Sequence, residues 1–210
     1  MMYALVENNE IIKYLNGNKG ITIGEYQYPK SIFTLWTEEE RNAIGVYSVT
    51  IDTTNKQDEA YYINTDITYA YANGAVTGSY GTPTAKSLDD TLYTAQDETD
   101  GLIPEGKSVG DVAIEGLKSQ KIRIIKQQAA GLLAPTDWHV VKASEVANYS
   151  VPVNISAYRA DVRAKSNEME GQINACTTVD ELAALYIYTN TGTDENPNIT
   201  RPLAEFPEEI

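Results

Sequence analysis

The residues of this chain that could carry out chemistry are few and lie far apart in the sequence. The only histidine is His139 and the only cysteine is Cys176. A hydrolytic triad needs a general base beside its nucleophile, and His139 follows Trp138 in a segment expected to be a packing turn. Cys176 falls near the end of an apolar helical face, where burial is expected, and no Gly-Ser-Gly elbow accompanies either residue. The sequence therefore indicates no acyl-transfer site, and we predict no catalytic residue and no enzyme activity.

Paired carboxylates offer a second kind of chemistry, the cleavage of glycosidic bonds. Candidates are Asp89-Asp90, followed by Asp97, Glu98 and Asp100 in an acidic loop. Adjacent acids in turn-rich sequence are usually solvated, so a glycan-degrading enzyme is only the third interpretation. The same loop offers oxygen ligands for Ca²⁺, but its spacing does not match the twelve-residue calcium loop. The sequence predicts no metal ligand and no cofactor.

Trp138 has two interpretations. An exposed ring could stack on a sugar, whereas a buried ring would fill the gap between two helices beside Tyr158. The flanking Leu132-Leu133 and Val140-Val141 favour burial. Truncating such a buried ring costs about 3–5 kcal/mol, which is enough to decide whether a small module folds.

The other residues that we single out also belong to packing. Arg159 and Arg163 lie one helical turn apart, with Asp161 and Glu145 as candidate ion partners. Most such pairs are solvated and contribute under about 1 kcal/mol. The predicted structural residues are Trp138, Tyr158, Arg159, Arg163, Leu132 and Trp36.

A helical module over residues 111–188 must position most of these side chains. Ile122, Ile125, Ala129 and Leu132 follow helical spacing, and Pro135 is expected to end that helix, with a brief extended segment over 138–141. Pro152 suits the start of a second helix, on which Tyr158, Val162, Met169 and Ile173 form one apolar face. Thr178 is expected to cap a further short helix. The sequence thus predicts a helical hairpin.

Residues 1–84 are typical of a small antiparallel β domain with one short helix. Asn8-Asn9 and Asn73-Gly74 are hairpin-turn signals because Asn and Gly tolerate positive φ. Thr37 with Glu40 forms the pattern of a capping box, and Gly45 supplies a helix stop. Residues 85–110 are expected to be a linker and residues 189–210 an extended, polar tail. The predicted fold class is therefore α+β.

The composition narrows the classes of function. The formal net charge of −14 disfavours nucleic-acid binding, because an acidic surface repels phosphates. No apolar run approaches the ~20 residues that cross a bilayer, so membrane insertion is not expected. A secretion signal is not expected either, because the amino terminus lacks a basic segment. The aromatic residues are 15 Tyr against 2 Phe and 2 Trp, and Tyr suits half-exposed sheets or subunit contacts.

Several stretches resemble tail-fibre and tail-fibre-assembly proteins of tailed bacteriophages, especially those of marine hosts. The first is 2–9 (Met-Tyr-Ala-Leu-Val-Glu-Asn-Asn), followed by 29–33 (Pro-Lys-Ser-Ile-Phe) and the capped helix to Val46-Tyr47. The second is 59–62 (Glu-Ala-Tyr-Tyr). The third runs from Trp138 to Arg163, with Arg201-Pro202-Leu203 at the close. These are packing and turn residues without a catalytic signature.

The resemblance implies a structural protein of the virion tail, made in the host cytoplasm, as a fibre, baseplate or adaptor piece. Its partners would be other tail proteins and further copies of itself, with a trimer as the expected homo-oligomer because closed symmetric assemblies are the rule. The alternative is a tail-fibre assembly chaperone that is not retained in the virion. The resemblance implies no cofactor.

Overall fold

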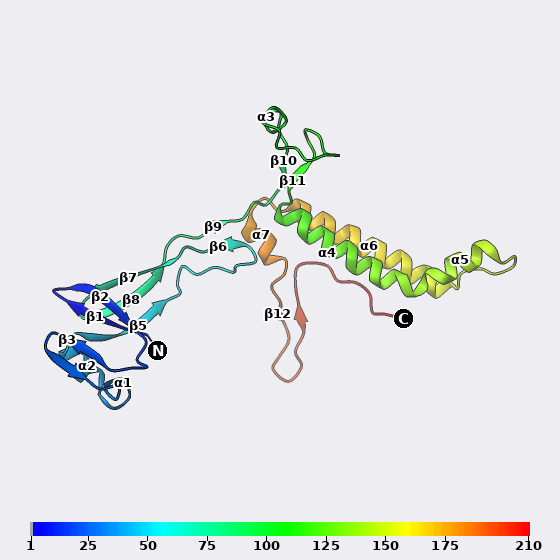
Figure 1. Cartoon of the computed structure of the whole chain (residues 1–210). Helices are drawn as coiled ribbons and strands as arrows, with labels where there is room; N and C mark the ends of the chain where they lie inside the picture. The colour runs from blue at the N-terminus through cyan, green and yellow to red at the C-terminus, as the bar shows by residue number, and fades with distance from the viewer. Residues whose placement is uncertain (1) are drawn as a thin grey trace. The chain divides into compact units, whose positions relative to one another are not determined.

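The computed structural model describes residues 2–210, which form an α+β fold as predicted. The chain divides into two compact units, Met1–Thr84 and Ala85–Ile210. Strands dominate the first unit and helices the second (Figure 1). Each unit has its own hydrophobic clusters, so each is described by itself.

A five-stranded sheet in the order β2-β1-β5-β8-β7 forms the framework of the first unit. Small two-stranded ladders join β3 to β4 and β6 to β9. The elements are β1 (Tyr3–Glu7), β2 (Glu10–Leu15), β3 (Ile21–Ile23), β4 (Tyr26–Tyr28), α1 (Ile32–Leu35), α2 (Glu38–Ala43), β5 (Val46–Asp52), β6 (Tyr62–Ile63), β7 (Ile67–Ala72), β8 (Ala75–Tyr80) and β9 (Thr84–Ala85).

The sheet is not wholly antiparallel, so that part of the prediction is wrong. Strands β5 and β8 run parallel, with Val49 opposite Val76, while the other neighbouring pairs are antiparallel. Parallel neighbours need a long connection, and here residues 53–74 supply it. Strand β8 lies beside β5, and β7, which forms a hairpin with β8, is the edge strand. The unit also has two short helices where one was predicted.

Two tight turns fix the register of the hairpins, as the sequence predicted. Asn8 and Asn9 have φ of 53° and 66°, and Asn73 and Gly74 have φ of 52° and 76°. Two consecutive residues with positive φ match the right-handed twist of the flanking strands. The turns therefore hold β1 against β2 and β7 against β8.

Strand β1 is buried on both faces and joins two hydrophobic clusters. Successive side chains of a strand point to opposite faces, so Tyr3 and Leu5 enter one cluster and Ala4 and Val6 the other. The first cluster also holds Ile32, Phe33 and Val46, and the second also holds Val76.

Trp36 packs against the first of these clusters at the end of α1. It is half-buried, and its ring meets Tyr28 edge to face with the centroids 5.9 Å apart. Its carbonyl oxygen accepts a hydrogen bond from the Arg41 guanidinium. The helix that carries Arg41 begins at the predicted capping box, in which Thr37 N–H donates to Glu40 and Glu40 N–H donates to the Thr37 hydroxyl. This places Trp36 in the core of the first unit.

The two edge strands of the sheet, β2 and β7, are bridged by an aromatic contact. The rings of Tyr14 and Tyr69 lie 5.0 Å apart. Tyr69 faces Gly78 across the ladder, and a Cβ at position 78 would lie 2.6 Å from the Tyr69 ring. Because Gly78 has no side chain, the Tyr69 ring can lie over it and contact Tyr14 of the opposite edge strand. Bridged edges are less available for unspecific strand pairing.

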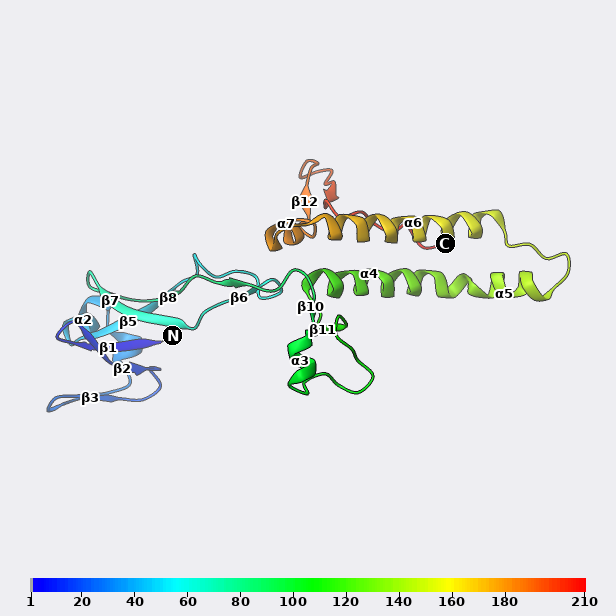
Figure 2. The same ribbon diagram turned by 90° about the horizontal axis from the view of Figure 1, so that it is seen from above.

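Two antiparallel helices, α4 and α6, form the core of the second unit and lie side by side (Figure 2). Ala129 of α4 and Tyr158 and Val162 of α6 are buried together, with half-buried Leu132 and Leu133 packed against them. The elements are β10 (Thr91–Leu92), α3 (Ala95–Thr99), β11 (Val112–Ile114), α4 (Leu117–Leu133), the 3₁₀ turn η1 (Ala134–Thr136), α5 (Asp137–Glu145), α6 (Val153–Ala175), α7 (Val179–Ala184), β12 (Thr189–Asn190) and β13 (Ile199–Thr200).

Pro135 follows the end of α4 at Leu133, as predicted, but it does not end helical structure altogether. It occupies the first turn of η1, where its missing N–H costs nothing, and α5 follows directly. The expected extended segment at 138–141 is therefore helical. The expected linker also has structure of its own, because β10 pairs with β11 and α3 lies between them.

The carboxyl-terminal segment folds back on its own unit, unlike the expected extended tail. Strands β12 and β13 form a hairpin, and Leu203 is completely buried. Leu203 N–H donates to the Leu185 carbonyl (3.0 Å). The Gln172 amide donates to the Pro202 carbonyl (3.1 Å) and accepts from Ala204 N–H (2.8 Å). These bonds attach residue 203 to the end of α7 and residues 202 and 204 to α6.

Replacing Leu203 by Ala is expected to lower the free energy of unfolding by about 2–5 kcal/mol, because it leaves a cavity under the attached segment. Urea unfolding followed by circular dichroism measures the change. Ile210→Ala is the matched control, since Ile210 is 66% exposed, and it should change stability by less than about 0.5 kcal/mol. Equal effects of the two substitutions would show that the segment is not attached.

Candidate interaction surface on the helical unit

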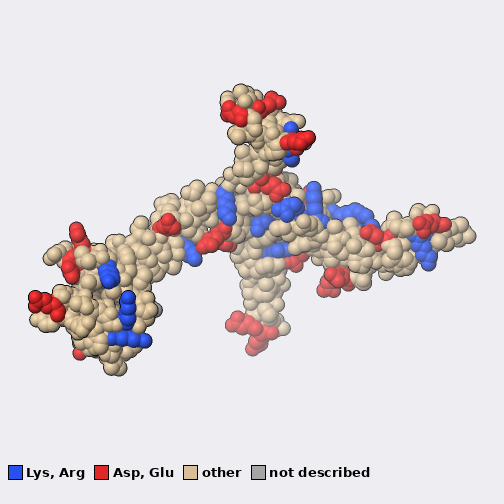
Figure 3. Space-filling view, viewed as in Figure 1, with Lys and Arg blue, Asp and Glu red and all other residues tan. Residues whose placement is uncertain are grey.

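Helix α4 carries a concentration of positive charge that is unusual for this acidic chain. Its 17 residues include Lys118, Lys121, Arg123 and Lys126 and no acidic residue. Lys and Arg atoms gather over α4, whereas Asp and Glu dominate the arm formed by residues 91–114 (Figure 3). A surface of one sign on a molecule of the other sign is a candidate for contact with a complementary partner.

A shallow groove of about 420 Å³ runs along this basic helix. All of its lining residues come from one face of α4, at spacings of three, four, seven and eight. Ile122 and Ala130 give it an apolar floor, and Arg123 and Lys126 give it charged sides. The lining residues are Ser119, Ile122, Arg123, Lys126, Gln127 and Ala130.

The charges beside the groove already have partners within the unit, but the cationic side chains are themselves largely exposed. Arg123 contacts Glu115 and Lys126 contacts Glu170, each at 3.2 Å. The two cationic side chains are 53% and 62% exposed. Exposed ion pairs contribute under about 1 kcal/mol and exchange readily, so both cations can turn toward an incoming acid.

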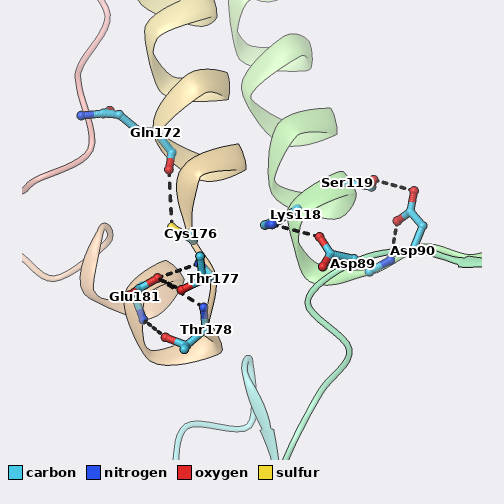
Figure 4. A network of polar contacts seen from close by, with 10 residues as sticks. Asp89, Asp90, Lys118, Ser119, Gln172, Cys176, Thr177, Thr178 and Glu181 are labelled. Atoms are coloured by element: carbon cyan, nitrogen blue, oxygen red, sulfur yellow. Dashed lines mark hydrogen bonds and ion pairs between the residues drawn. The ribbon is translucent and has the colours of Figure 1, made fainter.

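Residues 87–90 fix the start of α4 and replace a local cap. Gly116, at the N-cap position, has no side chain to accept from the first turn, and Asp90 does this from a distance (Figure 4). Its carboxylate accepts from Gly116 N–H (2.7 Å) and from the Ser119 hydroxyl (2.8 Å). A negative charge also suits the positive end of the helix. Asp89 adds an ion pair to Lys118 at 2.9 Å.

The same contact depends on a glycine. A Cβ at Gly116 would lie 2.3 Å from the Asp89 carbonyl carbon and 2.4 Å from its oxygen. Both are backbone atoms, which cannot turn aside as a side chain does. The N–H groups of Leu117 and Lys118 donate to the carbonyls of Ser87 and Leu88 at 2.9 and 3.0 Å. We call this set of contacts between residues 87–90 and the start of α4 the clamp.

The clamp holds an arm that comprises residues 91–114, namely β10, α3 and β11. The arm contains five acidic side chains and one lysine. It also exposes large apolar side chains, which is unusual for so small an element. Their exposed fractions are 47% for Leu92, 62% for Leu102, 45% for Val109, 37% for Val112 and 65% for Ile114.

Asp97 and Asp100, two of the carboxylates considered for sugar cleavage, have local structural contacts in the arm. Asp97 accepts from the Thr94 hydroxyl (2.6 Å) and N–H (2.7 Å), closing the capping box of α3. These bonds hold the pKa of Asp97 below its usual value, which is opposite to what a general acid needs. Asp100 accepts from the Gln96 amide at 2.8 Å. The hydrogen bonds of Asp97 and Asp100 therefore stabilise the ends of α3 and do not prepare either carboxylate to donate a proton.

The tip of the helical hairpin gathers the aromatic residues around the only histidine. Trp138 and His139 stack with their centroids 3.7 Å apart, and His139 Nδ1 lies 2.5 Å from the Tyr149 hydroxyl. The Lys142 ammonium lies over the Tyr149 ring at 4.5 Å. Trp138 is 53% exposed, so the prediction that it fills the gap between the helices is wrong. It lies on α5, beyond the paired part of α4 and α6.

Tyr158, Leu132 and Arg159 fill the region between the helices instead. Arg159 is buried, and its guanidinium donates to the Leu133 carbonyl (3.0 Å) and the Thr136 hydroxyl (2.5 Å). It pairs with Asp137 at 2.8 Å, not with the predicted Asp161 or Glu145. Asp137 is the first residue of α5, so this pair joins the start of α5 to α6.

Arg163, one turn further along α6, is exposed and donates to the Arg159 carbonyl at 3.2 Å. It extends the polar edge of α6 and does not enter the core. The two arginines that the sequence grouped together thus have different surroundings, one buried and one exposed.

Cys176 is buried at the end of α6, away from the histidine. Its thiol donates to the Gln172 carbonyl at 3.4 Å, and burial raises the pKa of the thiol. The thiol therefore stays protonated, which disfavours nucleophilic chemistry. Nearby, Glu181 accepts from Thr177 N–H (2.6 Å) and hydroxyl (2.9 Å), and these bonds lower its pKa (Figure 4).

The sequence signal for the basic groove was visible but was not used. Four cations without an acid in 17 residues stand out against a net charge of −14. The role of Asp89-Asp90 had no comparable signal, because the helix that they cap begins 26 residues later.

In comparisons with known proteins, no family model, no curated protein and no solved structure matches the chain. Between residues 2 and 210, no three His, Cys, Asp or Glu side chains are grouped so that they could hold a metal ion. Over the same residues, no helix has the length and apolar character needed to cross a membrane.

Gly116→Ala is expected to lower the free energy of unfolding by about 1–3 kcal/mol, because the added methyl group meets the backbone of the clamp. Gly131→Ala, in the same helix, is the matched control, since a Cβ there has nothing within 4 Å. The control should stabilise by about 0.5–1 kcal/mol through helix propensity. Urea unfolding monitored by helical circular dichroism gives both values, and the same sign for both would contradict the clamp.

Glu181→Gln is expected to reduce the loss of stability in acid. The folded-state pKa of Glu181 lies below its ordinary value of 4.5, so the ionised group stabilises the native state above that pH. This stabilisation disappears as pH falls through the folded-state pKa. The urea midpoint of the variant should therefore fall less than that of the natural protein between about pH 5 and pH 3. The exposed Glu209→Gln serves as control and should retain the natural pH dependence.

Proposed function

We propose that this protein is a structural component of a bacteriophage tail, a fibre, baseplate or adaptor piece that works through protein–protein contacts in a symmetric assembly. The assignment to a bacteriophage is supported by the sequence resemblance alone. The observation that carries the proposal of protein contacts is the set of large apolar side chains that the helical unit leaves exposed on its arm and at the tip of its hairpin.

The tip of the hairpin is the clearest example. Val153 is 87% exposed and Trp138 53%, and Val141 and Val146 are about half exposed. Exposed large apolar side chains that include a tryptophan are typical of contacts with other proteins. A valine has no flat ring on which a sugar could stack, so the exposed valines favour a protein partner over a glycan.

The chemistry of the carboxylates supports the same proposal. A glycan-cleaving enzyme needs a carboxylic acid that stays protonated near neutral pH. The Asp97 pKa is displaced in the other direction, and Asp97 and Asp100 both have bonds within α3. We therefore propose a function without catalysis.

Mass spectrometry of purified particles of the phage that encodes this chain tests the proposal. We expect the polypeptide at a fixed stoichiometry relative to the other tail proteins, and crosslinks from residues of the helical unit to a neighbour. Absence from the particles, combined with a need for the chain during fibre folding, would instead indicate an assembly chaperone. Absence without such a need would overturn both.

A further inference from the structure

The basic groove of α4 and the acidic arm are complementary surfaces on the same chain. We propose that the arm of one copy lies in the α4 groove of a neighbouring copy, so that copies associate head to tail. This inference rests on the proposed function, because it specifies one contact of the symmetric assembly. It uses surfaces that the fold leaves uncovered in each copy.

Charge is the first match between the two surfaces. The arm carries Asp97, Glu98, Asp100, Glu105 and Asp111 against a single lysine. The groove is flanked by two exposed cations, Arg123 and Lys126, whose present ion pairs leave more than half of each cationic side chain in solvent. An arriving arm adds acids to these pairs, and long-range attraction brings the two surfaces together in the correct orientation.

Apolar surface is the second match. Ile122 and Ala130 line the groove and lie on the same face of α4, where they offer apolar surface to an aliphatic side chain. The arm offers Leu102 and Ile114, which are 62% and 65% exposed. An acidic element with large aliphatic side chains therefore fits a groove with an aliphatic floor and basic sides.

The clamp explains why the occupant is a second copy. Asp90 bonds to Gly116 and Ser119, and Asp89 pairs with Lys118, so the base of the arm is fixed at the first turn of α4. Ser119 is also the first residue of the groove. Both views show the arm directed away from the helix from that point (Figures 1 and 2). An arm held in this direction does not reach the groove of its own α4.

Such a contact joins two different surfaces, so it is heterologous. Heterologous contacts close into a ring when the rotation between copies permits it and otherwise continue as a filament. The predicted trimer would be a closed ring of this kind, with each copy supplying one arm and one groove.

Charge reversal tests the contact in the full chain. The groove variant carries Arg123→Glu and Lys126→Glu, and the arm variant carries Glu98→Lys and Glu105→Lys, which are exposed positions. Each variant alone places like charges in the contact. Sedimentation velocity at low salt should show association at least about tenfold weaker than for the natural protein. The matched control for the arm variant, Glu208→Lys with Glu209→Lys, makes the same change of charge outside the arm and should associate like the natural protein.

Rescue experiments separate a specific contact from a general effect of charge. All four substitutions in one chain should restore association, because the two new acids of its groove can then pair with the two new lysines of an arm. An equimolar mixture of the two variants should also associate. The two kinds of chain must alternate in the assembly, so a closed ring of them has an even number of copies. Helical circular dichroism equal to that of the natural protein shows that the variants are folded, and Arg123→Gln with Lys126→Gln replaces the groove variant if it is not.

The outcomes distinguish this inference from the proposed function. A natural chain that associates, with an arm variant no weaker than the control, overturns the arm contact and leaves the tail protein standing. A natural chain that is monomeric at about 100 μM, far above typical interface affinities, overturns the contact as well. Failure of both rescues with folded variants does the same. If the rescue variants associate but the natural chain is absent from phage particles, the arm contact is supported and the proposed location in the tail is overturned.

Discussion

The helical unit depends on the bonds between Asp90 and the first turn of α4. A helix that begins at a glycine has no side chain to satisfy its first N–H groups, and leaving such groups unpaired is costly. Asp90 and the carbonyls of Ser87 and Leu88 accept these hydrogens from another part of the chain. One set of contacts thus determines where α4 begins, where the arm leaves it and where the groove starts. Gly116 makes the approach possible because any side chain would collide with the backbone of Asp89.

Features that depend on near neighbours in the sequence were predicted well. The capping boxes at Thr37 and Thr178, the Asn-rich hairpin turns and the start of α6 after Pro152 all have the predicted form. Each rests on backbone groups three or four residues apart, which a short pattern specifies. Features that depend on distant pairing were missed, including the parallel β5–β8 pair, the cap by Asp90 and the attachment of Leu203 to the end of α7. A local sequence pattern does not specify which distant segment of the chain will pair with it.

Trp138 shows how one misplaced element changes the interpretation of a residue. With Pro135 as the end of the helix, the tryptophan would lie in a turn between two helices and be buried. In the structure the chain continues through η1 into α5, since proline is tolerated in the first turn of a helix. The gap is filled by Tyr158 and the buried Arg159, whose guanidinium satisfies the carbonyl of Leu133 and the hydroxyl of Thr136. The tryptophan is thereby left on the surface, where it is available to a partner.

The distribution of charge relates solubility to specificity. A net charge of −14 repels copies of the chain from one another wherever two acidic surfaces meet. Contact is then favourable only where an acidic element meets the one helix that carries four cations and no acid. Repulsion elsewhere removes competing arrangements, and attraction at the groove selects one orientation. Because exposed charges are screened by salt, this selection affects the rate and the register of association more than the final affinity, which must come from the aliphatic side chains that the contact covers.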